Sequence, residues 1–293
     1  MSVRKSIVFA LIAAIALGFV VLGLSALHLI NGDEGETATL EIASLPADRY
    51  SSRGILPLEI DAELGAIEVY LVEPDGSLLP PPQGARQEIW ELAVRIMTLD
   101  DATSLIERYK VANSAASTRT AWVVERPQGE DDWSLGVNLA TTTDPVQLAA
   151  TLVHEYAHLV SLRGSQVVAS GAHCTTVELP EGCALPGSYL DAFAHAFWAD
   201  YGDEAPSAAN SDAGVARAFF ASRPGDFVSE YAAMNVTEDF AESFAAYVHT
   251  DVVPHGPGFA AKIAFFDRFE EMAGMRDRIR AELGDALGRY RLG

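Results

Sequence analysis

A long uncharged and mainly apolar run opens the chain. Arg4 and Lys5 precede residues 7–27, which contain no charged side chain. As a helix this run is roughly 32 Å long, enough to cross a bilayer core, whereas the apolar region of a cleavable signal peptide is usually shorter. We therefore predict a signal anchor, a transmembrane helix within residues 1–30. Secretion is the alternative if the segment is cleaved near Ser25.

The clearest helical periodicity lies in the middle of the chain. Apolar residues that recur every three or four positions would form one buried face, namely Leu148, Leu152, Tyr156 and Leu159. Asp144 is a good N-cap residue, Pro145 suits the first helical position, and Gly164 supplies a stop signal. The pattern predicts a helix of about five turns between these signals.

Shorter apolar patterns indicate strands and further helices around this central helix. Strand-like pieces occur at residues 39–42, 66–72, 120–126 and 133–140, and helical patterns at 87–99 and 259–287. This mixture predicts an α+β fold with a mixed or antiparallel sheet. Residues 135–139 are either an edge strand, beside which an extended peptide could pair, or an ordinary internal strand.

The central helix carries candidate metal ligands. His154 and His158 lie one helical turn apart on the same face, so both imidazoles can reach one zinc ion at about 2.0–2.1 Å. Glu155 projects close enough to handle the proton of a bound water. Two unrelated histidines are the alternative, but imidazoles on so apolar a helix are costly to bury without a partner. The motif therefore predicts one Zn²⁺ ion.

A catalytic zinc needs a third protein ligand, because such sites have three ligands and one position for water. Glu238 and Glu242 lie one turn apart on a second predicted helix. Glu238 could ligate the metal while Glu242 hydrogen-bonds a ligand histidine from behind. Glu230, Asp239 and Glu242 are competing ligand choices, and a solvated acidic helix face is the structural alternative.

The two segments together resemble the gluzincin metallopeptidases of the anthrax lethal factor type. Tyr231 stands seven residues before Glu238, and Phe240-Ala241-Glu242 follows it, as in that family. The resemblance implies a zincin-like catalytic domain with an active-site helix. It also implies roles for individual residues, with His154, His158 and Glu238 as zinc ligands, Glu155 as general base, Tyr231 as oxyanion donor and Glu242 as support.

The chain departs from the family pattern at three points. Ala157 and Ser161 stand where the family often has glycine and aspartate. The interval between His158 and Glu238 is also longer than usual, which indicates an insertion at about residues 164–225. These departures concern substrate preference and efficiency more than metal binding.

Two cysteines, Cys174 and Cys183, both fall in this insertion. A local disulfide in an oxidising compartment is the favoured interpretation, and two free thiols or a metal clip with His173 are the alternatives. The basic residues before the apolar run should stay cytoplasmic, so we expect the rest of the chain to be periplasmic or at the cell surface.

The overall charge limits the partners. The formal net charge is −21, from 41 acidic and 20 basic residues. Such a surface repels nucleic acid, so we expect no nucleic-acid partner. The expected partners are a peptide or protein substrate and, through the N-terminal helix, a membrane.

These patterns give a domain division and a functional hypothesis. Residues 1–30 are the anchor, 31–82 a linker with a small β-rich leading segment, and 83–293 the catalytic domain. The predicted function is zinc-dependent peptide-bond hydrolysis outside the cytoplasm by a metalloendopeptidase. The alternatives are a non-hydrolytic zinc-containing binding or sensing domain and a zinc amidase that acts on cell-wall peptides.

Overall fold

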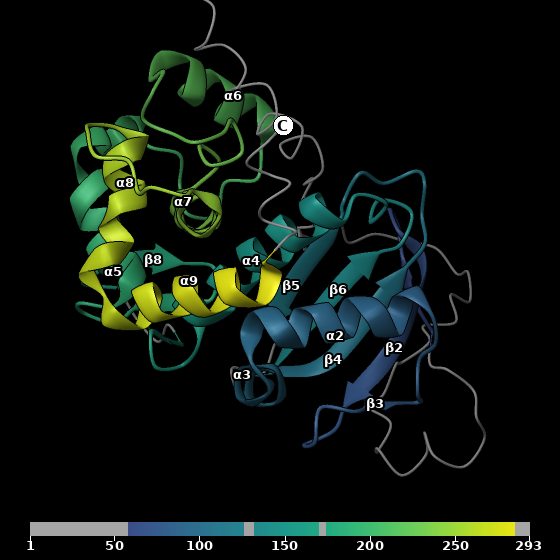
Figure 1. Cartoon of the computed structure of the whole chain (residues 1–293). Helices are drawn as coiled ribbons and strands as arrows, with labels where there is room; N and C mark the ends of the chain where they lie inside the picture. The colour runs from purple at the N-terminus through teal and green to yellow at the C-terminus, as the bar shows by residue number, and fades with distance from the viewer. Residues whose placement is uncertain (1–57, 126–131, 170–173, 285–293) are drawn as a thin grey trace, which may run out of the picture.

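The computed structural model describes residues 58–125, 132–169 and 174–284 (Figure 1). The predicted membrane anchor and the predicted strand at 39–42 lie outside these residues. Within the described part of the chain, no helix combines the length and apolar character needed to cross a membrane.

A mixed six-stranded sheet forms one part of the fold. Its strand order is β1-β2-β4-β6-β5, with β3 paired to β2; β4 and β6 run parallel, and the other pairs are antiparallel. The strands are β1 (Leu58–Asp61), β2 (Gly65–Val72), β3 (Leu78–Leu79), β4 (Ile106–Ala112), β5 (Ala121–Glu125) and β6 (Trp133–Asn138). The expected α+β class with a mixed sheet is confirmed.

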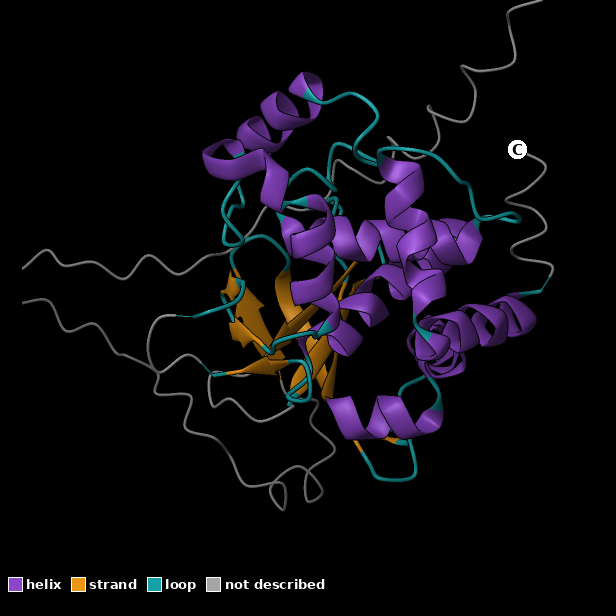
Figure 2. Cartoon of the chain, turned by 90° about the vertical axis from the view of Figure 1, so that its left-hand side faces the viewer, coloured by secondary structure: helices purple, strands orange, loops and turns teal. Residues whose placement is uncertain are grey.

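Helices cover the sheet and build the rest of the molecule. In Figure 1, α2 crosses a face of the sheet, and Figure 2 shows the strands grouped together with helices around them. The α-helices are α2 (Ala85–Met97), α3 (Leu99–Leu105), α4 (Pro145–Leu162), α5 (Tyr189–Phe197), α6 (Ala213–Ser222), α7 (Val236–His249), α8 (Phe259–Phe265) and α9 (Glu270–Leu283). In the described part of the chain, the 3₁₀ helices η2 (Ala199–Glu204) and η3 (Phe266–Arg268) follow α5 and α8.

β5 forms one edge of the described sheet, because β6 lies between β4 and β5. β6 is also buried along its whole length. Of the two alternatives for residues 135–139, the structure therefore selects the internal strand. Trp122 of β5 packs over Gly136 of β6, where an added Cβ would lie 2.0 Å from the indole ring. Glycine at this position lets the large ring lie flat against the sheet.

The leading strands do not form a separate unit. β2 pairs with β4 in a register that places Tyr70 opposite Tyr109. Lys110 also reaches back to Glu59, with Nζ 2.8 Å from Oε2. Strand pairing thus joins segments on both sides of residue 82 in the described chain.

α4 is a buried central helix with a well-defined start. The Asp144 carboxylate accepts hydrogen bonds from the backbone N–H groups of Val146 and Gln147, at 2.8 and 3.3 Å. Pro145 occupies the first helical turn, where a missing N–H costs nothing. Every residue from Leu148 to Leu162 is buried, so the polar side chains of this helix must find partners inside the protein.

The predicted insertion contains its own small sheet. β7 (Val167–Val168), β9 (Gly182–Ala184) and β8 (Glu178–Leu179) lie side by side in that order, followed by α5, η2 and α6. A disulfide joins Cys174 to Cys183, which decides among the three interpretations of these cysteines. The disulfide connects the segment before β8 to β9.

A buried ion pair fixes α7 against α8. Asp239 Oδ2 lies 2.6 Å from Lys262 Nζ, and both side chains are almost fully buried. The indole N–H of Trp198 also donates to this carboxylate oxygen at 2.8 Å. The Lys262 ammonium lies 3.8 Å from the centre of the Phe227 ring, a favourable cation–π position.

We expect Lys262→Met to lower the free energy of unfolding by about 3–5 kcal/mol, because it leaves the Asp239 carboxylate buried without its cation. Urea unfolding of the metal-free protein measures this loss. Arg217→Met is the matched control, since it breaks an exposed pair with Glu230 and should cost less than about 1 kcal/mol. A Lys262→Met loss as small as that of the control would contradict the argument.

Candidate metal centre

Two imidazoles of α4 face one another across a single helical turn. The Nε2 atoms of His154 and His158 lie 3.1 Å apart, and both side chains are buried. Their rings are nearly perpendicular, with centroids 4.8 Å apart. Each ring therefore turns one nitrogen toward the same small volume.

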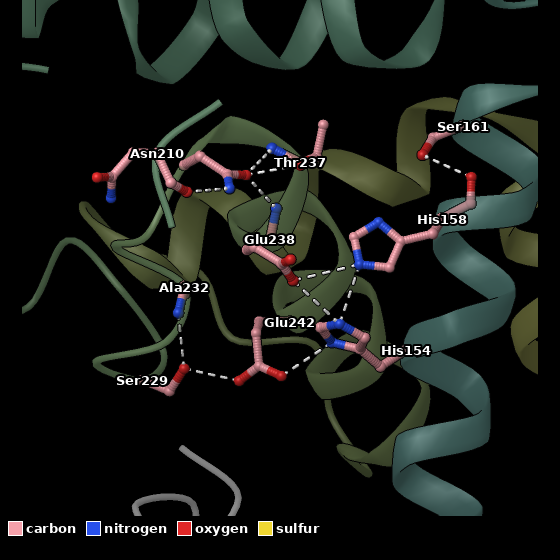
Figure 3. Close-up of polar contacts among 10 residues, drawn as sticks. His154, His158, Ser161, Asn210, Ser229, Ala232, Thr237, Glu238 and Glu242 are labelled. Carbon is pink, nitrogen blue, oxygen red and sulfur yellow. Dashed lines mark hydrogen bonds and ion pairs between the residues drawn. The ribbon is translucent and has the colours of Figure 1, made fainter. Parts of the chain in front are cut away.

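A carboxylate from α7 completes this group. Glu238 Oε2 lies 3.2 Å from Nε2 of His154 and 3.2 Å from Nε2 of His158 (Figure 3). The N-cap residue of α7 positions this first turn, because the Asn235 side chain accepts hydrogen bonds from the N–H groups of Thr237 and Glu238. The three ligand atoms come from two helices, with 80 positions between His158 and Glu238, and lie within 4.8 Å of one another.

The spacing of these atoms fits a bound metal ion. Tetrahedral ligands at 2.0–2.1 Å from a zinc-sized ion stand about 3.3 Å apart, close to the 3.1 and 3.2 Å separations of the Nε2 and Oε2 atoms. Three electron-pair donors that converge in a buried site repel one another unless a cation or proton lies between them. His154, His158 and Glu238 could therefore bind a metal ion.

Glu242 contacts His154 at the ring nitrogen that is not directed at the other two ligand residues. Its Oε1 lies 2.9 Å from Nδ1 of His154, and its Oε2 accepts a hydrogen bond of 2.6 Å from Ser229. Ser229 Oγ in turn accepts from the backbone N–H of Ala232 at 3.0 Å (Figure 3). A proton on Nδ1 of His154 shared with Glu242 leaves the lone pair of Nε2 directed at the centre.

The charges at the centre favour a cation. Burial opposes ionisation of Glu238, but the adjacent imidazoles of His158 and His154 outweigh it and lower the pKa of this carboxyl. Burial likewise opposes protonation of His154, yet the carboxylates of Glu238 and Glu242 raise its pKa well above the usual value. A raised pKa means that His154 holds a proton in the absence of a metal. A divalent ion bound at the centre would take the place of that proton.

Glu155 and Tyr231 line the cavity beside the three ligand residues. The cavity has a volume of about 160 Å³. The backbone N–H of Val123 in β5 donates a hydrogen bond to the Glu155 carboxylate, whereas burial raises the pKa of this group. Burial and the neighbouring Glu238 also raise the pKa of Tyr231, so its hydroxyl keeps its proton and remains a hydrogen-bond donor.

The three other candidate ligands do not belong to the group formed by His154, His158 and Glu238. Glu230 is partly exposed and pairs with Arg217 at 3.1 Å. Asp239 lies on another side of α7 and pairs with Lys262. Glu242 contacts the outer nitrogen of His154 rather than the centre.

Three contributors to this site carry no recognisable signal in the sequence. Val123 acts through its backbone, Ser229 orients Glu242, and Glu181 reaches the cavity from the β8–β9 hairpin. No spacing rule links these residues to the two histidines, since only the folded chain brings them together. Comparisons with protein-family models, curated proteins and solved structures find no match for this chain.

We expect the wild-type protein to bind one metal ion and Glu238→Ala to lose more than about 100-fold in affinity. Removal of a direct ligand should exceed the effect of an outer partner, so Glu242→Gln should lose about 10–100-fold. Competition titration with a chromophoric zinc chelator measures both. Glu230→Ala is the matched control and should bind as the wild type does; full affinity in Glu238→Ala would exclude it as a ligand.

Proposed function

We propose that this protein is a zinc-dependent hydrolase that cleaves peptide bonds. The observation that carries the proposal is that one cavity holds a possible metal-binding group and two further side chains suited to hydrolysis. These two side chains are Glu155 and Tyr231. Neither is needed to bind a metal, so a purely structural metal site would not explain them.

The donor set supports zinc as the ion. Two imidazole nitrogens and one carboxylate oxygen, from His154, His158 and Glu238, are a common ligand set of catalytic zinc, with the fourth position open to water. Zinc bound there would polarise the scissile carbonyl and lower the pKa of a water molecule to about 7.

Glu155 has the position and environment of a general base. It follows the first ligand histidine on α4 and is buried in the same cavity. Burial increases the affinity of its carboxylate for a proton, and the Val123 N–H donates to the same carboxylate. Glu155 would accept a proton from the attacking water and pass it to the leaving amine.

Tyr231 supplies a hydrogen-bond donor. Its ring centroid lies 5.9 Å from that of His154, and its hydroxyl hydrogen-bonds Glu238. The hydroxyl can turn to donate to the negative oxygen that develops on the substrate as the carbonyl is attacked.

The edge strand supports a peptide as the substrate. Trp122 and Val123 of β5 line the cavity, and β5 lies at the edge of the described sheet. An extended peptide beside this strand could form main-chain hydrogen bonds and place its carbonyl near Glu155.

The compartment belongs to the same proposal. The Cys174–Cys183 disulfide is typical of an oxidising environment. Together with the apolar N-terminal run, it supports a membrane-anchored, gluzincin-type peptidase whose catalytic domain lies outside the cytoplasm.

Glu155→Gln should lower hydrolysis about 10²–10⁴-fold while the protein keeps its zinc, because the amide cannot accept the proton. A fluorogenic peptide library measures cleavage, with a chelator as a control for metal dependence, and elemental analysis measures the zinc. Unchanged cleavage by this variant would remove Glu155 from the mechanism. Absence of cleavage by the zinc-loaded wild type would contradict the proposed function.

Tyr231→Phe should lower kcat about 10²–10³-fold with little change in KM, since the lost hydroxyl acts mainly in the transition state. Tyr201→Phe is the matched control, because its hydroxyl contacts Asp226 and Tyr201 does not line the cavity. An equal loss in both variants would indicate a structural effect rather than oxyanion stabilisation.

A further inference from the structure

The turn between β8 and β9 places an acidic side chain in the wall of the cavity. β8 and β9 pair with Glu178 opposite Cys183 and Leu179 opposite Gly182, so Pro180 and Glu181 form the connecting turn. Glu181 lines the same cavity as His158 and Glu155. The carboxylate thus comes from the insertion rather than from the two helices that carry the ligands.

The position of this turn is closely constrained. Gly182 has a φ of +146°, and an added Cβ would lie 2.2 Å from the carbonyl oxygen of Val168. Only glycine therefore allows β9 to approach β7 so closely. The disulfide between Cys174 and Cys183 also ties β9, next to Gly182, to the segment that precedes β8. Both restraints keep Glu181 at the cavity.

Among the described residues, the imidazole of His158 is the basic group that acts on the Glu181 carboxylate at the cavity wall. Its Oε2 atom is buried and has no hydrogen-bond partner among the described residues. It does not belong to the group formed by His154, His158 and Glu238. None of the described residues that line the cavity is a lysine or an arginine. A buried carboxylate oxygen of this kind requires a donor, and the open side of the cavity is where one can enter.

We propose that Glu181 binds an ammonium or guanidinium group of the substrate and so determines specificity at this site. This inference rests on the proposed function. A cationic substrate group would form a charge-assisted hydrogen bond with the carboxylate. A substrate with an uncharged side chain of the same size would leave Glu181 unpaired, so the cavity discriminates against it.

The cation has two possible sources, which peptide design can separate. A lysine or arginine side chain next to the scissile bond is one, and a free N-terminal amine is the other. N-acetylated hexapeptides with lysine or norleucine at each position test the side chain. The same norleucine peptides with a free N-terminus test the amine.

Wild-type protein should cleave the best cationic peptide with at least a tenfold higher kcat/KM than its uncharged counterpart. Glu181→Gln should lose this advantage, whereas Glu181→Asp should retain part of it. Glu178→Gln is the matched control, because Glu178 is exposed on the same hairpin and does not line the cavity. An advantage that persists in Glu181→Gln, or that is absent from the wild type, would overturn the proposal.

A binding readout separates this inference from the proposed function. The same peptides are titrated calorimetrically against the Glu155→Gln protein, with and without zinc, and against Glu155→Gln/Glu181→Gln. Tighter binding of the cationic peptide that disappears in the double variant supports the role of Glu181 even if the wild type hydrolyses nothing. If the protein cleaves peptides but neither readout discriminates by charge, the proposed peptidase function stands and the role of Glu181 is refuted.

Discussion

The packing of α4 against α7 is the constraint on which the rest of this structure depends. α4 is buried along most of its length and still carries two imidazoles and a carboxylate. α7 presents Glu238 at the point where the nitrogens of His154 and His158 converge. Polar groups placed so deeply are stable only when they meet partners, so the relative position of the two helices determines whether a metal site exists.

Neighbouring residues of α7 hold that position from different sides. Glu238 faces α4, and Asp239 pairs with Lys262 of α8. Glu242 contacts the Nδ1 atom of His154. A rotation of α7 about its axis would break all three interactions together. The buried ion pair, which is weak evidence for stability by itself, therefore has a clear role in fixing the direction of Glu238.

Besides α4 and α7, which carry the metal-binding group, three other parts of the fold contribute to the cavity. The edge strand β5 contributes the Val123 N–H that orients Glu155, the turn before α7 contributes Tyr231, and the disulfide-linked hairpin contributes Glu181. Three carboxyl groups, those of Glu155, Glu181 and Glu238, line the cavity, and no lysine or arginine stands among the described lining residues. A metal ion and a cationic substrate group are the two kinds of positive charge that these carboxyl groups could bind.

The sequence by itself determined the local features, because these depend on neighbours along the chain. The capping of α4 by Asp144, the same-face placement of His154 and His158, and the helix that carries Glu238 all follow from spacing and residue type. Tertiary structure alone decided that β5 forms the sheet edge, that Glu238 rather than Asp239 faces the histidines, and that Glu181 enters the cavity. Strand order, helix rotation and the path of an insertion depend on contacts between distant residues, which no local pattern encodes.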